Sequence, residues 1–149
     1  MRELKLFEFL TESNFIEREP EPNKGEIFSA LKFLDNPSLE TLKSYVHATS
    51  GASIRNKPTM NVRVGDHVAP QGGDSIPIAV EMILDAVIEN KSPIYAFKHH
   101  VEYETLHPFM DGNGRSGRLI WYFQMKENAP IGFLQQWYYQ TLSFGEIRT

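Results

Sequence analysis

One segment of twelve residues, 107–118 (HPFMDGNGRSGR), combines residue types that could act on a phosphate ester. Pro108 ends the helix predicted before it, because proline disfavours helical backbone in the preceding residue. Three glycines follow within the segment, and they free the backbone where the next helix begins. A helix start presents unpaired N–H groups and the positive end of the helix dipole. The segment therefore predicts an anion site at a helix N-terminus.

Four charged or titratable side chains flank this predicted anion site. Arg115 and Arg118 are three positions apart on the predicted helix, so they project from the same side, and guanidinium groups match phosphate oxygens. Asp111 lies at the rim, where a carboxylate could hold Mg²⁺ or Mn²⁺ together with phosphate oxygens. His107 carries the usual general base near neutral pH. Together these groups supply what transfer of a phosphorus group to a hydroxyl requires.

The same segment could instead be a simple turn or a different nucleotide-binding motif. A stretch rich in Gly, Asn and Asp between two helices is usually only a turn. A turn would explain the presence of any one of these residues, but it does not explain all of them within twelve positions. Residues 112–117 also fit the G-x-G-x-x-G dinucleotide pattern. That pattern needs a preceding buried strand, whereas the residues before it are predicted helical and no parallel sheet is evident. No Gly-Lys-Ser/Thr follows the glycines, so a Walker A loop is absent.

The rest of the chain predicts a mainly α-helical fold. A polar break at residues 11–14 separates a short first helix from a further helical turn, and two prolines make residues 19–23 a linker. Ile27, Phe28, Leu31 and Leu34 mark one helix face, and Ser38 is a good N-cap for the next helix. Further helices are expected at about 76–88, 93–106 and 133–142, and the helix that follows the Gly-rich loop carries Leu119, Ile120 and Phe123.

Residues 50–75 are the exception, because they are rich in Gly, Pro and Asn and show little helical pattern. Within them Met60, Val62 and Val64 alternate with polar residues, and Gly65-Asp66 offers a hairpin turn. A two-stranded ribbon is therefore predicted. Since an isolated hairpin is only marginally stable, this one must pack on the helical body.

Composition sets the broad class of the protein. Its 149 residues are the length of one domain, spanning 1–149, and 41% hydrophobic residues can form a core. The net charge of -4 argues against nucleic acid as a partner. The absence of cysteine excludes disulfides and Cys-based sites. No signal-peptide core or membrane span is recognised, so we expect a cytoplasmic protein with no membrane partner. Oligomeric state stays open, a homo-oligomer included.

Residues 107–118 resemble the complete signature of the Fic family. The resemblance extends upstream, because residues 51–55 and 62–65 are similar to the segment that leads into the Fic flap hairpin, here at about 59–69. It covers about residues 13–123 and implies a Fic-type helical domain with one β-hairpin flap. His100 and Glu104 stand where many Fic sequences have a His and a Glu, and we expect a buried polar pair that supports the active-site loop.

The resemblance implies a protein adenylyltransferase that moves AMP from ATP to a Ser, Thr or Tyr hydroxyl of a target protein. His107 would deprotonate that hydroxyl, and Asp111 would hold Mg²⁺ on the α- and β-phosphates. Arg115 would contact the β-phosphate region and Arg118 the γ-phosphate. The anion nest would be formed by Gly112, Asn113 and Gly114.

The same resemblance implies roles for Phe109 and for the hairpin. Phe109 is expected to face the core and anchor the loop. The hairpin of about residues 60–68 would clamp the target by adding its extended backbone to a strand edge. The docking residues would be Met60, Val62 and Val64.

The N-terminal region is similar to a Ser/Thr-x-x-x-Glu inhibitory helix that some Fic proteins carry, here at about 11–19 with Ser13 and Glu17. In such proteins the Glu pairs with the second arginine of the signature and displaces the γ-phosphate, which here would mean Glu17 with Arg118. The family pattern normally has Gly or Asn where this chain has Arg18. Alternatively, Glu17 is only a solvated helix charge.

Alternative functions remain open. Some Fic relatives move UMP, phosphate or phosphocholine, or remove AMP, but the intact stretch 112–115 favours AMP. A non-catalytic interaction module that binds a partner through the hairpin is the alternative from another class. The intact His107 and Asp111 count against that module.

Overall fold

The computed structural model describes residues 2–90 and 92–125, and this part of the chain is mainly α-helical, as predicted. The hairpin strands are β1 (Arg63–Val64) and β2 (His67–Val68), and a 3-10 turn, η1 (Pro93–Tyr95), precedes α5. The helices in this part of the chain are α1 (Arg2–Ile16), α2 (Lys24–Asp35), α3 (Leu39–Thr49), α4 (Ser75–Glu89), α5 (Ala96–Leu106) and α6 (Asn113–Met125). The last helix predicted, at 133–142, lies outside the described residues.

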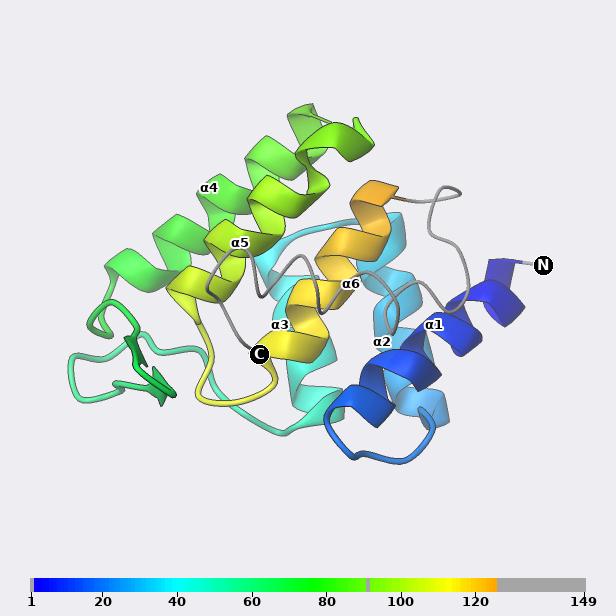
Figure 1. Cartoon of the computed structure of the whole chain (residues 1–149), viewed down its shortest axis with the longest axis horizontal. Helices are drawn as coiled ribbons and strands as arrows, with labels where there is room; N and C mark the ends of the chain where they lie inside the picture. Colours follow the sequence, from blue (N-terminus) through cyan, green and yellow to red (C-terminus); the bar gives the residue numbers. More distant parts are fainter. Residues whose placement is uncertain (1, 91, 126–149) are drawn as a thin grey trace.

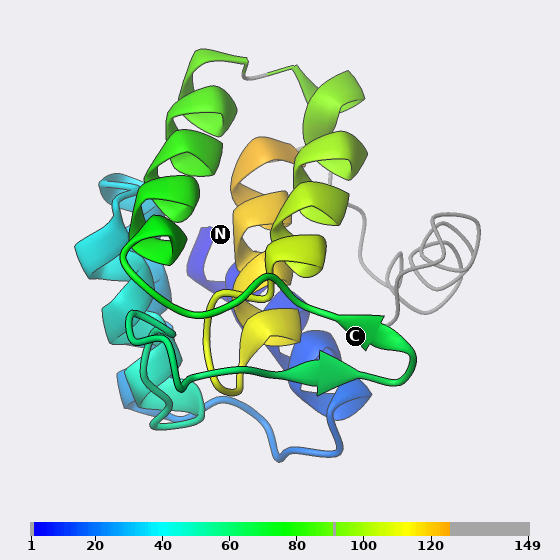
Figure 2. The same ribbon diagram turned by 90° about the vertical axis from the view of Figure 1, so that its left-hand side faces the viewer.

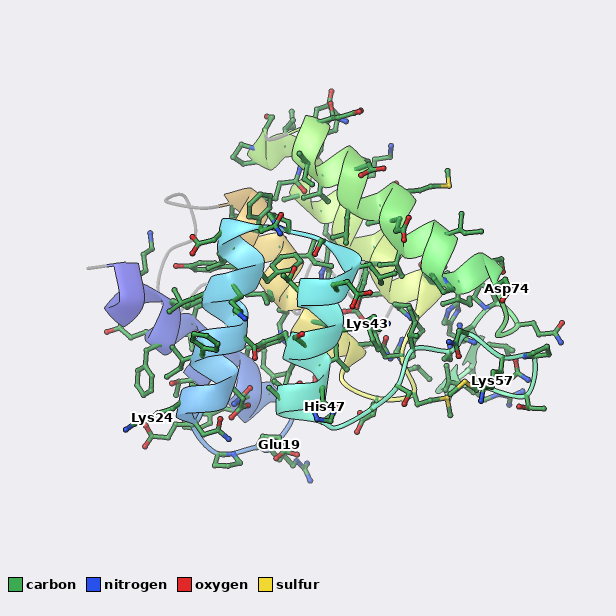
Figure 3. The ribbon with its side chains drawn as sticks, turned by 180° about the vertical axis from the view of Figure 1, so that it is seen from behind. Glu19, Lys24, Lys43, His47, Lys57 and Asp74 are labelled. Atoms are coloured by element: carbon green, nitrogen blue, oxygen red, sulfur yellow. The ribbon has the colours of Figure 1, made fainter. Side chains whose placement is uncertain are left out.

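Helix α6 is the centre of the fold. It contacts α1, α3, α4 and α5, and Figure 1 shows it surrounded by them. Leu119, Ile120 and Trp121 are each no more than 2% exposed, so nearly every side of the helix is covered. Figure 3 shows the opposite face, where α2 lies beside α3 and where Lys43 and His47 lie on α3. None of the helices in the described ranges is both long and apolar enough to cross a bilayer.

Helix α1 is continuous, so the break expected at residues 11–14 is wrong. Thr11 bonds back to the carbonyl of Phe7 at 2.8 Å, within the helix. Ser13 and Asn14 are buried rather than solvated, and the Asn14 amide donates to Glu26 of α2 at 3.2 Å. Polar residues that would cap a helix on the surface are here buried by tertiary partners.

Aromatic packing fixes α1 on α6. The Phe9 ring stacks on Trp121 with 5.9 Å between the ring centroids, and it lies 4.5 Å from Tyr122. Such pairs add about 0.5–1.5 kcal/mol beyond the area that they bury. The middle of α1 is therefore held at a defined place beside the second half of α6.

Helices α2 and α3 begin with the capping boxes that their sequences favour. Asn23 accepts from the Glu26 amide at 2.9 Å, and Ser38 accepts from the Thr41 amide at 3.2 Å. Of the four residues predicted to mark the buried face of α2, three pack partly buried against the core, namely Ile27, Leu31 and Leu34. The fourth, Phe28, is 60% exposed, and the fully buried aromatic residue is Phe33. Phe28 instead lies under the Lys32 ammonium, 4.9 Å from the ring centroid.

The predicted hairpin is present but short. Its register pairs Arg63 with Val68 and Val64 with His67, around a turn in which Gly65 has φ of 57°. Of the three expected docking residues, only Val64 lies in a strand. Figure 2 shows the hairpin and its flanking segments crossing in front of the loop that joins α5 to α6.

Gly117 allows α5 and α6 to pack closely. A Cβ placed on this glycine would lie 2.5 Å from Glu104 Oε1 and 3.0 Å from the Tyr103 ring. We therefore expect Gly117→Ala to lower the free energy of unfolding by about 1–3 kcal/mol, the usual cost of overpacking. Urea denaturation followed by circular dichroism measures this change. Gly25→Ala is the control, because its Cβ would meet only the Asn23 side chain, at 3.3 Å. Equal stability losses at the two positions would contradict the assignment.

Candidate active site

His107 ends α5 in an unusual backbone conformation. Its φ of 49° and ψ of 61° are left-handed, a conformation that commonly ends helices but is uncommon for a residue with a side chain. Its Nδ1 lies 3.3 Å from the carbonyl oxygen of Glu104. A carbonyl can only accept, so Nδ1 carries the proton and Nε2 keeps a free lone pair. That tautomer is the one a general base acting through Nε2 requires.

The surroundings of His107 keep its ring neutral. Burial lowers its pKa first, and the charges of Arg55 and His67 lower it further. The Glu104 carbonyl and the Asp111 carboxylate act in the opposite direction but do not reverse the shift. Because the pKa falls below its ordinary value, the imidazole is unprotonated at neutral pH and can accept a proton.

The loop after His107 is stabilised by hydrogen bonds within the loop and by contacts with the segment that precedes the hairpin. Phe109 is 1% exposed, as expected of an anchor. Its amide donates to Asn113 Oδ1, and Asn113 Nδ2 donates back to the Phe109 carbonyl, both at 2.8 Å. The side chain of Asn113 thus closes the loop, while its backbone begins α6. Phe109 also forms a β-bridge with Ile54, and the Met110 amide donates to Ser53.

At Gly112 both the backbone conformation and the lack of space for a side chain require glycine. Its φ of 81° favours glycine, and an added Cβ would lie 2.7 Å from Ser50 Oγ. Its carbonyl accepts from the Ser116 amide at 3.0 Å, which starts the hydrogen-bonding of α6. The backbone therefore passes tightly from the loop into the helix start that was predicted to bind an anion.

A cavity of about 110 Å³ lies where these elements meet. It is lined by the catalytic candidates and by one residue from each of two distant segments, Glu17 and Val64. The remaining lining residues are His107, Met110, Asp111, Gly112, Asn113, Gly114 and Arg115. A larger cavity of about 810 Å³ lies against α2 and α3; Met60 lines it, but His107 and Arg115 do not.

Asp111 fits a metal that takes most of its ligands from elsewhere. The residue is exposed at the rim of the smaller cavity, and its Oδ1 accepts from the Gly112 amide at 2.7 Å. No group of three or more His, Asp or Glu side chains suited to a metal occurs among residues 2–90 and 92–125. Mg²⁺ commonly binds through one or two carboxylates together with phosphate oxygens and water, so a single carboxylate is compatible with it.

The two signature arginines have different surroundings. Arg115 lines the cavity and donates one weak hydrogen bond to the Thr49 carbonyl, at 3.4 Å. Its Nε has no hydrogen-bond partner among the described residues. Arg118 is fully buried and its Nε donates to Ser13 Oγ at 2.7 Å. Its Nη2 donates to the Ser13 carbonyl at 3.1 Å and to Glu17 Oε1 at 2.8 Å.

Glu17 is not in a helix, although helix was expected over about 11–19. Helix α1 ends at Ile16, and the Glu17 amide donates to the Asn14 carbonyl in a tight turn. The turn places Arg18 at φ of 58°, in the left-handed region that favours Gly and Asn. The turn therefore gives a physical reason why the inhibitory-helix pattern described above normally has Gly or Asn at this position.

His100 and Glu104 form the buried pair that was expected. His100 Nε2 lies 3.7 Å from Glu104 Oε1, and His100 Nδ1 donates to the Gly117 carbonyl at 3.2 Å. Burial lowers the pKa of His100 to about 3, with Arg118 adding to the shift, and burial raises the pKa of Glu104 to about 8. Both groups are therefore mainly neutral at pH 7, and they support α6 rather than line the cavity.

Two residues beside His107 were not predicted from the sequence. Arg55 is fully buried and donates to the His107 carbonyl at 2.7 Å. His67 Nε2 donates to the Thr105 carbonyl at 2.8 Å. Their partners are backbone atoms, and no side-chain spacing in the sequence indicates such a contact.

A family model described as Fic/DOC family matches residues 33–125, from the end of α2 through the whole of α6. The match includes the hairpin, the loop and both signature arginines. It begins after α1, so Ser13 and Glu17 lie outside it.

The left-handed turn at Arg18 gives a stability prediction. Arg18→Gly relieves the left-handed strain but adds freedom to the unfolded chain, so we expect the free energy of unfolding to be unchanged or to rise by up to about 1 kcal/mol. Arg18→Val should lower it by about 1–2 kcal/mol, because a β-branched residue is an outlier there. Thermal melts measure both changes. The control Glu21→Val is an exposed change outside the turn, and a loss there as large as that of Arg18→Val would contradict a specific strain at Arg18.

Glu104 gives a pH prediction. Its folded-state pKa is raised to about 8 from an ordinary 4.5, so between these values the folded protein holds a proton that the unfolded chain releases. This contribution to stability is present below pH 4.5 and is lost as the pH rises towards 8. Glu104→Gln should remove the loss, so the variant should gain stability relative to the parent between about pH 5 and pH 8. Urea titrations at about pH 5 and about pH 8 measure the free energy of unfolding of both proteins. A stability difference between variant and parent that is the same at the two pH values would contradict the raised pKa of Glu104.

Proposed function

Because the chain belongs to the Fic/DOC family, whose members typically transfer nucleotide-derived groups to proteins, we propose that it transfers AMP from ATP to a hydroxyl side chain of a target protein. The observation that carries the proposal is one cavity in which a neutral His107, the exposed Asp111 and Arg115 lie around a helix start. These are a base, a metal carboxylate and a phosphate ligand, placed together as transfer of a phosphorus group requires.

In the proposed reaction His107 Nε2 takes the proton from a Ser, Thr or Tyr hydroxyl of the target. The hydroxyl oxygen forms a bond to the α-phosphorus of ATP, and the bond from that phosphorus to the bridging oxygen breaks. Pyrophosphate leaves with the electron pair of the broken bond, and AMP stays on the target. The tautomer fixed by the Glu104 carbonyl supports this role, because it leaves Nε2 without a proton.

The phosphates would be held by the start of α6. Backbone N–H groups of Asn113 and Gly114 would face the α- and β-phosphates, and that of Gly112, which donates to Asp111 Oδ1 at 2.7 Å, would exchange this acceptor for a phosphate oxygen. Arg115 would contact the β-phosphate region. Asp111 would hold Mg²⁺ or Mn²⁺. The metal would neutralise charge on the phosphate oxygens as pyrophosphate departs. The position of Arg115 supports this assignment, because the residue lines the cavity and its Nη1 is engaged by no more than a long hydrogen bond, at 3.4 Å, to the Thr49 carbonyl.

The hairpin would position the target. Its strands are short, and Val64 of β1 lines the cavity that also contains His107. An extended target segment pairing with the hairpin edge would therefore pass close to the base. Met60 and Val62 lie outside the two strands, and the Val62 carbonyl already accepts from the Ala69 amide across the hairpin, so in this proposal they shape the approach to the hairpin rather than pair with the target.

We further propose that Glu17 keeps the enzyme inactive. Its carboxylate lines the cavity and accepts from Arg118, the arginine expected to bind the γ-phosphate. A triphosphate placed there would meet a negative charge and would find its arginine occupied by Ser13 and Glu17. Glu17 is 31% exposed at its side chain, so it can be displaced without unfolding α1.

The proposal predicts that Glu17→Gly switches labelling on. With labelled ATP and Mg²⁺, this variant should incorporate AMP into itself or a lysate protein at least about tenfold faster than the parent, because Arg118 becomes available to the γ-phosphate. Adding His107→Ala should lower the rate about 10²-fold or more, the usual contribution of a general base. Scintillation counting of the precipitated protein measures both rates.

Glu19→Gly is the matched control, because Glu19 is exposed two positions away and lines neither cavity. Labelling by the parent that equals that of Glu17→Gly would refute autoinhibition. Labelling that persists without His107 would remove the assigned base. Stronger competition by unlabelled UTP than by unlabelled ATP would make UTP the donor and UMP the transferred group.

A further inference from the structure

Arg55 is not assigned as base, metal ligand or phosphate ligand in the transfer described above, yet it is among the largest fully buried side chains of the described chain. Burial lowers its pKa, but a guanidinium stays protonated at any physiological pH. A buried charge is costly unless it is well paired, and charged hydrogen bonds of this kind are strong. The partners of Arg55 therefore indicate what the side chain stabilises.

All of these partners are backbone carbonyls. Nε donates to His107 at 2.7 Å and Nη2 donates to Leu106 at 2.9 Å, so one edge of the guanidinium caps the end of α5. Nη1 donates to Met60 at 3.0 Å and to Pro70 at 2.8 Å, which are the two ends of the hairpin segment. One rigid planar group thus joins the helix that carries the base to both ends of the segment that carries the hairpin.

The backbone of Arg55 contributes to the same connection. Its amide donates to the Pro108 carbonyl at 2.8 Å, and its carbonyl accepts from the Gly73 amide at 3.0 Å. The peptide groups of His107 and Pro108 are consequently held by Arg55 from two directions. His107 has a left-handed backbone, so these contacts stabilise a conformation that costs energy in an L-residue.

A second link runs parallel to the first. His67 of β2 donates to the Thr105 carbonyl at 2.8 Å. The last carbonyls of α5, from Thr105 to His107, are therefore all bonded by residues of the hairpin segment and by Arg55 before it. A helix end leaves such carbonyls without helical partners, and cations near it are favourable.

We propose that Arg55 is a positioning residue that fixes the backbone of His107 relative to the base of the hairpin, so that the general base and the docking hairpin form one unit. This inference rests on the proposed function for its catalytic consequence. The structural coupling itself does not depend on which group is transferred. The hydrogen bonds of the Arg55 side chain go to residues other than those assigned to the phosphates.

The catalytic test uses Arg55→Lys and Arg55→Gln in the Glu17→Gly protein. An ammonium keeps the charge but cannot span four carbonyls, so Arg55→Lys should lower the rate of AMP labelling at saturating ATP by about tenfold or more. The dissociation constant for ATP, from calorimetry, should change by less than about twofold, because the phosphate ligands are other residues. Lys98→Gln is the control, since it removes an exposed cation of α5 that pairs with Glu102.

A spectroscopic measurement separates geometry from charge. The groups that face the His107 ring or share its cavity are Arg55, His67, Asp111, Glu17 and Arg115. The imidazole pKa, from NMR titration, should stay low in Arg55→Lys and rise towards its ordinary value in Arg55→Gln. A normal labelling rate in Arg55→Lys would overturn the proposal. So would a loss of rate matched by an equal loss of ATP affinity, which indicates general damage to the fold.

A third measurement needs neither a folded Arg55 variant nor activity. In the unaltered protein, hydrogen exchange should report the same opening free energy for the amides of Arg55, His107 and Ala69, which donate to Pro108, Tyr103 and Val62. Exchange of the hairpin amide Ala69 that is independent of the other two would overturn the coupling. If this coupling is observed while Glu17→Gly labels nothing, the proposed function fails and the inference about Arg55 stands.

Discussion

The structure depends on how α5 ends. The chain must leave this helix at His107 and enter α6 at Asn113, which leaves carbonyls of the last turn of α5 facing away from the helix. The usual solution is a left-handed glycine, but a glycine could not act as a base. Here the strain of a left-handed histidine is offset by donors from a distant segment, Arg55 and His67. The proposed base and both ends of the hairpin segment therefore share one set of hydrogen bonds, and the Arg55 amide also holds Pro108, in the loop that leads to α6.

The second buried guanidinium, that of Arg118, differs from Arg55 because one of its partners is charged and partly exposed. The Arg55 side chain bonds to backbone carbonyls, which carry no net charge. Arg118 bonds to Ser13 and to the carboxylate of Glu17, which lies on a turn and is partly exposed. Breaking a buried pair by removing one partner usually costs about 3–5 kcal/mol, unless another charge takes the empty place. In the proposed cycle the γ-phosphate is that charge, so Arg118 keeps an anionic partner in both states.

Parts of this arrangement are visible in the sequence, and others are not. The helices after residue 38, the hairpin turn at Gly65 and the loop of residues 107–118 follow from periodicity, turn residues and glycine spacing. The pairing of Glu17 with Arg118 could be anticipated only through a family resemblance. The break placed at residues 11–14 was wrong because Ser13 and Asn14 have tertiary partners. Arg55 could not be predicted, since it binds carbonyls such as that of Leu106, 51 positions away. Local patterns record the type of a side chain but not the backbone that it meets.

In the proposed mechanism, the position of Glu17 beyond the end of α1 explains how one carboxylate can pair with Arg118 and later be displaced from it. Within a helix, its movement would break backbone hydrogen bonds of the helix itself. In the turn, only the amides of Glu17, Arg18 and Glu19 bond to the end of α1, each to a carbonyl of Asn14 or Phe15. Meanwhile α1 stays fixed through Phe9 on Trp121 and through Asn14 on Glu26. The left-handed Arg18 lies directly after Glu17 in this turn, and the Glu17 carboxylate lies 2.8 Å from the Arg118 guanidinium. Under the proposed mechanism, the inhibitory contact is therefore a property of how α1 ends, just as the catalytic base is a property of how α5 ends.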